Sequence, residues 1–257
     1  MTAALSSRTV KNALYGQVAR IGKAVSSPQR LELLHLLAHG EKPVETLAAQ
    51  TQLTIKNASA HLRVLREARL VEPRKEGQHV YYRLAEVGVA TFFLALRDLA
   101  ERRLAEVREV SQQYFGGRKQ MTPVDRRQLL SRIRAGAVTV LDLRDESEFA
   151  SGHIPGARSV PLGELRKALR TIPRDQEVVA YCHGPYCVLS LEAVQLLNAR
   201  GYRATRLDDG PVEWAAAGLP VERGPAARHG KSVITPTVQR RLPLRTTSSS
   251  WAEAPPA

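Results

Sequence analysis

Apolar residues recur with the helical period in the first part of the chain and predict three successive helices. The three segments are 26–40, 43–53 and 54–71. Ser27 and Pro28 suit the start of the first helix, and Gly40 suits its end.

The third segment has one apolar and one polar side. Ala58, Leu62 and Leu65 are spaced four and then three residues apart and therefore face inward, and Thr54 can cap the helix. The outer side is small, polar and basic, with Lys56, Asn57, Ser59, Ala60 and Arg63. A short helix, a tight turn and a helix with such a face predict a helix-turn-helix. Only small or hydrogen-bonding side chains let a helix read the roughly 12 Å wide major groove of DNA.

Residues 70–86 change to a strand pattern with a turn at Glu76-Gly77. The predicted hairpin carries Arg74, Lys75 and His79 near its tip. Such a wing would lie along DNA phosphates, which position a protein without reading the sequence.

Residues 89–110 predict one long helix with an apolar stripe that continues to Val107. The stripe is longer than a small domain needs, so a partner chain is expected to cover it. Residues 9–25 can supply the other side of that contact.

The pattern changes again after residue 122. Near-continuous apolar runs at 138–143 and 177–182 predict strands buried on both faces, and residues 203–207 predict another strand. Helical patterns lie between them at 163–170 and 190–200, the second with Ser190 as its expected cap. This alternation predicts an α/β domain with a parallel sheet, in which ligands bind at the carboxyl ends of the strands.

Composition separates these parts further. The 257 residues carry a net charge of +13, and the first 121 contain 19 Lys and Arg against 11 Asp and Glu, which suggests a nucleic-acid partner. We expect a mainly α DNA-binding domain over 1–115, a linker over 116–122 and an α/β domain over 123–223. Residues 224–257, rich in Pro, Ser, Thr and Arg, are expected to be a disordered tail. The chain shows no secretory signal or membrane span, so a cytoplasmic location without membrane contact is expected.

Both cysteines of the chain, Cys182 and Cys187, lie in the loop after the second buried strand, AYCHGPYCVLS. A loop that leads into a helix offers backbone amides and the positive end of the helix dipole, which favour a thiolate or a negatively charged persulfide. Gly184 is expected to let the backbone curl close to the sulfur.

The first part resembles the ArsR/SmtB family of winged-helix repressors over about residues 8–110, most closely from Leu53 to Val71 and in GQHVYYRL. The resemblance implies a homodimer that binds a palindromic double-stranded operator. Metal sensors of that family carry a cysteine pair in the helix before the recognition helix, but here that helix reads VETLAAQ. The histidines at 35, 39, 61 and 79 show no tight ligand spacing, so core or surface roles are favoured and no metal is expected.

The second part resembles rhodanese (sulfurtransferase) domains over about residues 123–223, on the motifs LDLRDESEFASGHIPGARSVPL and DDGPVEWAAAGLPVE and the loop between strand and helix. The resemblance implies that Cys182 carries sulfur. The expected loop and pocket residues are His183, Gly184, Tyr186, Ser190, Asp142 and Arg144. Rhodaneses usually have arginine five residues after the cysteine, where this chain has Cys187. Because that arginine is missing, only weak turnover of thiosulfate is expected.

Cys187 is open to three interpretations. It can attack a persulfide on Cys182 and close a disulfide or polysulfide bridge. It can also be an apolar filler beneath the loop. A zinc site with Cys182 and His183 is a third option, which lacks an evident fourth ligand.

The favoured hypothesis is a transcriptional repressor whose rhodanese-like domain senses or carries sulfane sulfur on Cys182, with a sulfane-sulfur donor as partner and no bound cofactor. One alternative is a sulfurtransferase in which the first domain serves mainly for dimerisation. In another, the rhodanese-like domain is only a passive docking module.

Overall fold

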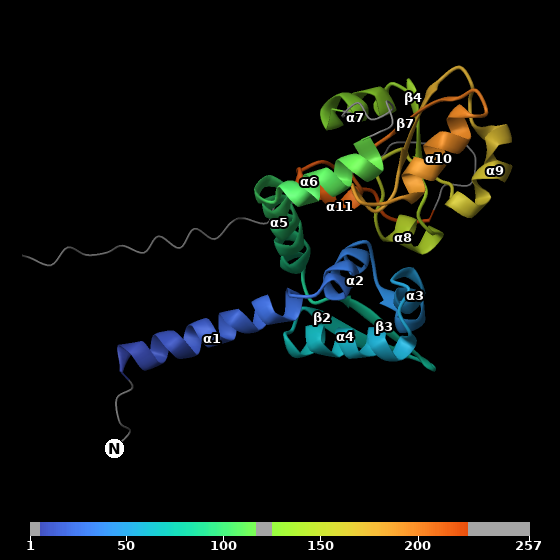
Figure 1. Ribbon diagram of the computed structural model, residues 1–257. Helices are drawn as coiled ribbons and strands as arrows, with labels where there is room; N and C mark the ends of the chain where they lie inside the picture. Colours follow the sequence, from blue (N-terminus) through green and yellow to red (C-terminus); the bar gives the residue numbers. More distant parts are fainter. Residues whose placement is uncertain (1–5, 117–124, 226–257) are drawn as a thin grey trace, which may run out of the picture. The chain divides into compact units, whose positions relative to one another are not determined.

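The structure, a computed structural model, describes residues 6–116 and 125–225. The first part of the chain consists of helices and a small antiparallel sheet of order β1-β3-β2 (Figure 1). Its elements are α1 (Ser7–Val25), α2 (Pro28–Ala38), β1 (Lys42–Pro43), α3 (Val44–Gln50), α4 (Ile55–Glu67), β2 (Val71–Glu76), β3 (His79–Leu84), α5 (Val87–Arg103), α6 (Ala105–Ser111) and the π-helical turn η1 (Gln112–Gly116). This is the winged helix-turn-helix that the apolar pattern predicts.

Local signals place the recognition helix α4. Thr54 is its N-cap, and the Thr54 hydroxyl accepts a hydrogen bond of 3.2 Å from the backbone N–H of Asn57. Ala58, Leu62 and Leu65 are fully buried, as the spacing predicts. Capping satisfies an amide that has no partner within the helix, and the buried stripe fixes which side of α4 faces solvent.

The wing is the hairpin of β2 and β3. Val71 pairs with Leu84 at its open end, and Glu76 pairs with His79 next to the turn. Gly77 in its turn has a φ of +59°, a left-handed conformation that glycine adopts without strain. The predicted turn is therefore confirmed.

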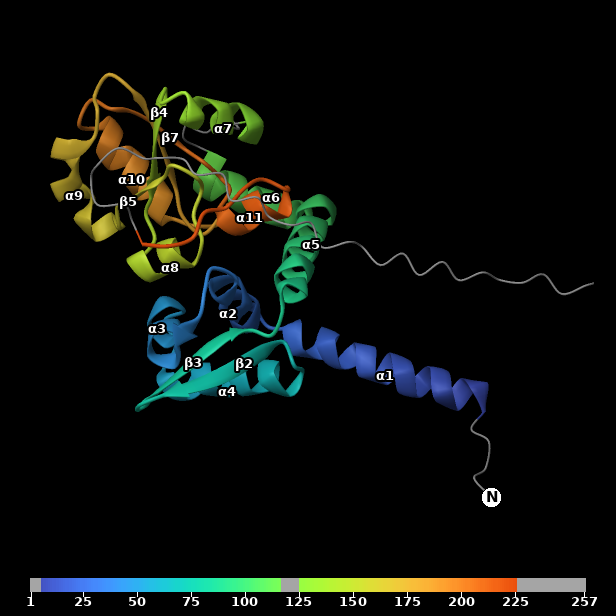
Figure 2. The same cartoon turned by 180° about the vertical axis from the view of Figure 1, so that it is seen from behind.

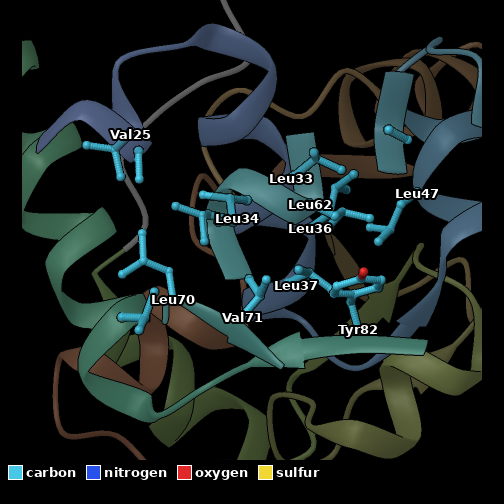
Figure 3. Close-up of a cluster of buried hydrophobic side chains, with 14 of the residues drawn as sticks. Val25, Leu33, Leu34, Leu36, Leu37, Leu47, Leu62, Leu70, Val71 and Tyr82 are labelled. Carbon is cyan, nitrogen blue, oxygen red and sulfur yellow. The ribbon is translucent and has the colours of Figure 1, made fainter. Parts of the chain in front are cut away.

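One apolar cluster joins helices α1 to α5 with strands β2 and β3 (Figure 3). Leu33, Leu34, Leu36 and Leu37 of α2 are buried in it beside Leu62 of α4. The helices α2 and α4 therefore share one close-packed core.

The prediction of one long helix over residues 89–110 is wrong. The helix is interrupted at Leu104, where the backbone is extended (φ −104°, ψ 112°), and α6 begins after it. Arg108 stabilises the break, because its guanidinium donates hydrogen bonds of 3.2 Å to the carbonyls of Glu101 and Arg102 at the end of α5.

The second part is an α/β domain with a four-stranded parallel sheet of order β5-β4-β6-β7. Its elements are α7 (Arg126–Arg134), β4 (Val138–Asp142), α8 (Glu146–Ser151), β5 (Arg158–Ser159), the 3₁₀ turn η2 (Leu162–Glu164), α9 (Leu165–Ala168), the 3₁₀ turn η3 (Leu169–Thr171), β6 (Glu177–Tyr181), α10 (Leu189–Asn198), β7 (Arg203–Arg206) and α11 (Pro211–Ala216).

Both faces of this sheet are covered (Figure 2). Val178 and Ala180 of β6 pack in a cluster with residues of α9 and α10. Val179 and Tyr181, the alternate residues of β6, pack in a second cluster with residues of α7 and α11. Burial on both sides explains the near-continuous apolar run of β6.

Two further expectations concern segments at the edges of the domains. The predicted linker lies outside the described residues except for Gly116, and the predicted disordered tail lies outside them beyond Gly224 and Pro225. Among the described residues, no helix is both long and apolar enough to cross a membrane.

Candidate functional site

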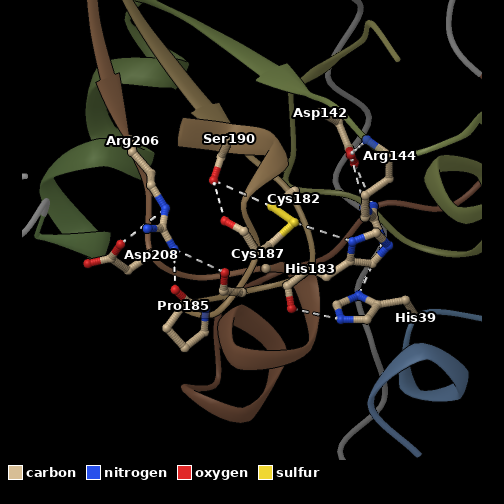
Figure 4. The surroundings of a disulfide bond; sticks show 12 residues. His39, Asp142, Arg144, Cys182, His183, Pro185, Cys187, Ser190, Arg206 and Asp208 are labelled. Atoms are coloured by element: carbon tan, nitrogen blue, oxygen red, sulfur yellow. Dashed lines mark hydrogen bonds and ion pairs between the residues drawn. A yellow bond between two sulfur atoms is a disulfide. The ribbon is translucent and has the colours of Figure 1, made fainter. Parts of the chain in front are cut away.

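The two cysteines lie at the carboxyl end of β6, which is one of the two inner strands of the sheet, between β4 and β7. Cys182 directly follows the strand and is buried, and Cys187 is half-buried in the loop before α10. Their sulfur atoms form a disulfide, with 6.4 Å between the two Cα atoms (Figure 4). The predicted pair of thiols is thus close enough to exchange sulfur.

Ser190 does not cap α10 as predicted. Val188 is the N-cap, and the helix begins at Leu189. Ser190 is instead fully buried, with its hydroxyl 3.4 Å from Cys182 Sγ and 3.4 Å from the carbonyl of Cys187. The helix starts two residues earlier than a Ser190 cap would require, so Ser190 lies within its first turn and its hydroxyl faces the Cys182 sulfur.

The loop between the cysteines is held from two sides. Gly184 has a φ of +122°, and a Cβ there would lie 2.8 Å from Glu213 Oε1 of α11. Arg206, at the end of β7, donates hydrogen bonds to the carbonyls of Gly184, at 3.3 Å, and Pro185. Glycine is therefore required by the neighbouring carboxylate as well as by the backbone conformation.

Asp142 and Arg144 form a buried ion pair at the end of β4. Arg144 NH2 lies 2.5 Å from Asp142 Oδ2 and also donates to the carbonyl of Gly152. The Tyr181 hydroxyl donates a 2.6 Å hydrogen bond to the same carboxylate. Several charge-assisted bonds of this kind stabilise the ends of β4 and β6. The segment between β6 and α10, residues 182–188, is called the sulfur loop.

His183 connects the loop to a buried carboxylate. Its Nδ1 is 3.6 Å from Cys187 Sγ, and its Nε2 is 2.8 Å from Glu148 Oε1 of α8. Lys42 of β1 places its ammonium 2.8 Å from the same oxygen, and both charged side chains are 2% exposed. Burial opposes ionisation of Glu148, but the hydrogen bond and the charge of the protonated His183 ring, followed by the charge of Lys42, outweigh it and lower the pKa of Glu148 to about 2.

The backbone of His183 contacts the winged-helix domain directly, within one compact unit of the chain. Its carbonyl accepts hydrogen bonds from Nε2 of His35, at 2.7 Å, and Nε2 of His39, at 3.0 Å. Both histidines lie at or next to the end of α2. Burial lowers the pKa of each, so both are neutral donors at pH 7.

The tip of the loop also contacts α5. The Tyr186 hydroxyl donates a 2.6 Å hydrogen bond to Glu101 Oε1. Beside it, Arg97 of α5 lies 2.7 Å from Glu213 of α11, and both side chains are largely buried. The sulfur loop is thus bonded to two helices of the DNA-binding domain.

The same loop contains a possible set of metal ligands. The ligand atoms of Cys182, His183 and Cys187 all lie within 4.8 Å of one another. Structural zinc sites use four ligands, and the disulfide occupies both sulfurs, so only the reduced form offers a three-ligand site.

The predicted DNA-binding residues lie apart from the sulfur loop, on α4 and the wing. Lys56, Asn57, Ser59 and Arg63 are exposed on α4, and Arg63 is 3.0 Å from Glu67 on the next turn. Lys75 is exposed on β2.

Two of the wing residues are engaged within the domain. Arg74 binds the Glu41 carboxylate through NH2 at 2.8 Å and is also paired with Glu76. His79 Nδ1 lies 3.4 Å from Glu45 of α3. These pairs are exposed, so DNA phosphates can compete for the basic side chains.

Four neighbours of the sulfur loop were not predicted from the sequence: Lys42, Glu148, His35 and His39. No spacing along the chain indicates them, because they come from three different elements. The only local signal is a pair of histidines, His35 and His39, one helical turn apart at the end of the leucine-rich helix.

Comparison with known proteins identifies both parts. Residues 27–72 match the arsR family of bacterial regulatory proteins, and residues 125–217 match the rhodanese-like domain. The chain is 42% identical to the HTH-type transcriptional regulator Rv0324 of Mycobacterium tuberculosis over 220 residues, which cover 86% of this chain and 96% of that one.

Other relatives match one part only. A sulfurtransferase of Allochromatium vinosum is 35% identical over 85 residues, 33% of this chain and 78% of that protein. A homodimeric winged helix-turn-helix DNA-binding domain, Mb0332 of Mycobacterium bovis, is 44% identical, with a TM-score of 0.37, and covers 40% of this chain and 94% of that one. The chain belongs to the ArsR family of HTH-type, DNA-binding transcriptional regulators and carries a C-terminal rhodanese-like domain.

Proposed function

We propose that this regulator is a cytoplasmic repressor whose affinity for DNA is switched by sulfane sulfur at Cys182. The observation that carries the proposal is the bridge between Cys182 and Cys187 in a loop whose His183 carbonyl binds α2 of the DNA-binding domain. The same loop thus contains the cysteines that would react with sulfane sulfur and the carbonyl that is bonded to the DNA-binding domain.

The proposed chemistry has two steps. A polysulfide or small-molecule persulfide transfers one sulfur atom to the Cys182 thiol, which becomes a persulfide. A persulfide donor leaves as its thiol, and a polysulfide donor leaves as a polysulfide one sulfur atom shorter. The Cys187 thiolate then attacks Cys182 Sγ, the disulfide forms, and the outer sulfur leaves as hydrogen sulfide. The sulfane sulfur is reduced and the two cysteines are oxidised, so no other oxidant is needed.

The connection runs from the loop through α2 to α4. Closing the bridge constrains the backbone on both sides of His183, whose carbonyl is bonded to His35 and His39. A nearly complete switch in DNA occupancy requires a difference on the order of 5 kcal/mol between states. Such a difference would have to come from contacts between the loop and the helices. These include two hydrogen bonds to the His183 carbonyl, worth about 1 kcal/mol each, and the buried Lys42–Glu148 and Arg97–Glu213 pairs.

We further propose that the protein binds a palindromic operator as a homodimer. Val10, Leu14, Tyr15 and Val18 of α1 are exposed apolar residues, with Tyr15 73% exposed. An apolar helix face of this kind is typical of a surface covered by a partner chain. A dimer would present two copies of α4 to successive major-groove turns.

The test is operator binding by fluorescence anisotropy, with a duplex selected by the protein from a random library. Wild type and Cys182→Ser are compared, each reduced and after polysulfide treatment. We expect at least a tenfold change in Kd for wild type only. Cys187→Ser is the matched control, which accepts sulfur but cannot close the bridge. Equal affinity in all four samples would refute the switch.

The second candidate is a sulfurtransferase, supported by the match of residues 125–217 to rhodanese-like domains. The missing arginine, replaced by Cys187, predicts weak turnover with thiosulfate and cyanide. Rapid turnover together with no selected operator would favour this enzyme over the regulator.

A further inference from the structure

The hydrogen bonds of His183 determine which of its ring nitrogens carries a proton. Nε2 lies 2.8 and 3.0 Å from the two carboxylate oxygens of Glu148. An ionised carboxylate only accepts hydrogen bonds, so Nε2 must be the protonated nitrogen. In the neutral ring Nδ1 therefore has a lone pair, and this nitrogen lies 3.6 Å from Cys187 Sγ.

Glu148 is held in place and kept ionised. Lys42 Nζ lies 2.8 Å from Glu148 Oε1 and 3.9 Å from Asp145 Oδ2, and the Lys42 and Glu148 side chains are buried. A buried lysine and a buried carboxylate stabilise each other's charge. The hydrogen-bond acceptor of His183 is thus the Glu148 carboxylate of α8, which is held in place by Lys42 of the DNA-binding domain.

We propose that His183 is the base that deprotonates Cys187, and that Glu148 and Lys42 are positioning residues for it. This inference rests on the proposed function, since the thiolate made in this way attacks the persulfide on Cys182. It adds His183 as the residue that makes Cys187 reactive. Through Lys42 of β1, it also links the reactivity of Cys187 to the DNA-binding domain.

The step is balanced as follows. His183 Nδ1 takes the proton of the Cys187 thiol and becomes an imidazolium, whose charge the Glu148 carboxylate stabilises. The Cys187 thiolate attacks Cys182 Sγ, the bond between the two persulfide sulfurs breaks, and the outer sulfur leaves with the electron pair as HS⁻. The imidazolium returns its proton to HS⁻, so H₂S is released and neutral His183 is restored.

The other titratable groups near His183 do not replace Glu148 in this role. The His39 ring centroid lies 4.9 Å from that of His183, and the His35 centroid lies 6.5 Å away. Both donate Nε2–H to the His183 carbonyl and are neutral at pH 7, because burial lowers their pKa values. Arg144 NH1 faces His39 Nδ1, 3.5 Å away. The carboxylate that contacts the His183 ring is Glu148.

The first experiment measures how fast iodoacetamide alkylates Cys187 as a function of pH. It uses reduced full-length Cys182→Ser, in which Cys187 is the only thiol, and compares it with the same protein carrying His183→Gln. A free thiol with a pKa of about 8.5 is only ~3% ionised at pH 7. We therefore expect His183→Gln to slow alkylation about tenfold at pH 7 and the two rates to converge above about pH 9.5.

Glu148→Gln in the same background is the second variant, and exposed Glu146→Gln on the same helix is its control. Glu148→Gln should lower the rate at pH 7, and Glu146→Gln should leave it unchanged. Circular dichroism shows whether each variant is folded, and only folded variants are compared. A His183→Gln or Glu148→Gln profile that coincides with that of the parent at every pH overturns the inference.

The second experiment separates this inference from the proposed function. Full-length reduced protein is treated with polysulfide, and mass spectrometry follows the persulfide and the disulfide while H₂S release is recorded. His183→Gln should accumulate the Cys182 persulfide and close the bridge about tenfold more slowly at pH 7. Closure at the wild-type rate overturns the role of His183. A Cys187→Ser protein that gains no persulfide refutes the proposed function, and the alkylation profile still decides the role of His183.

Discussion

Replacing Glu148 by Gln should destabilise the protein in a pH-dependent way. The side chain is 2% exposed and lies 2.8 Å from both Lys42 Nζ and His183 Nε2. Its pKa of about 2 in the folded protein compares with an ordinary value of 4.5. At 1.36 kcal/mol per pH unit, this corresponds to about 3 kcal/mol of stability that the ionised form contributes.

The sign follows from the direction of the shift. A lowered folded-state pKa means that the unfolded chain binds the proton more readily, so the contribution is complete above pH 4.5 and is lost as the pH falls toward 2. Glu148→Gln should therefore lower the free energy of unfolding by about 3 kcal/mol at pH 7. The difference from wild type should shrink below pH 4.5.

The assay is urea unfolding followed by tryptophan fluorescence in a Trp251→Phe background, which leaves the buried Trp214 as the only tryptophan. Glu146→Gln, exposed on the same helix, should change stability by less than about 0.5 kcal/mol. A loss below about 0.5 kcal/mol for Glu148→Gln, or a loss that is the same at pH 7 and pH 3, would refute the reasoning.

Three further predictions follow from other sites. Thr54→Ala removes the cap of α4 and should lower the free energy of unfolding by about 1 kcal/mol, measured by urea denaturation. Gly184→Ala should destabilise by about 1–3 kcal/mol, because its φ is +122° and the new Cβ would lie 2.8 Å from Glu213 Oε1. Gly163→Ala, whose Cβ would meet nothing within 4 Å, is its control and should be nearly neutral. Arg63→Ala should weaken operator binding by about 1–3 kcal/mol if the side chain reads a base, and an unchanged Kd would exclude that role.

Much of the architecture depends on interactions between residues close in sequence, and these were predictable. The Thr54 cap, the inward residues of α4 and the turn at Gly77 all follow from neighbours a few positions apart. The same holds for Cys182, since a cysteine directly after an apolar strand must lie at the carboxyl end of that strand. The break at Leu104 was missed because the side chain that stabilises it, Arg108, bonds to carbonyls seven and six residues earlier, on the other side of the interruption.

The surroundings of the sulfur loop were decided only by tertiary packing. Lys42 reaches Glu148, and His35 reaches the carbonyl of His183 across 148 positions of the chain. Each of these residues is ordinary in its local sequence. The apolar patterns of α2 and β6 determine that each element is buried but not which polar groups meet where the two domains pack, because burial has no direction whereas hydrogen bonds and ion pairs do.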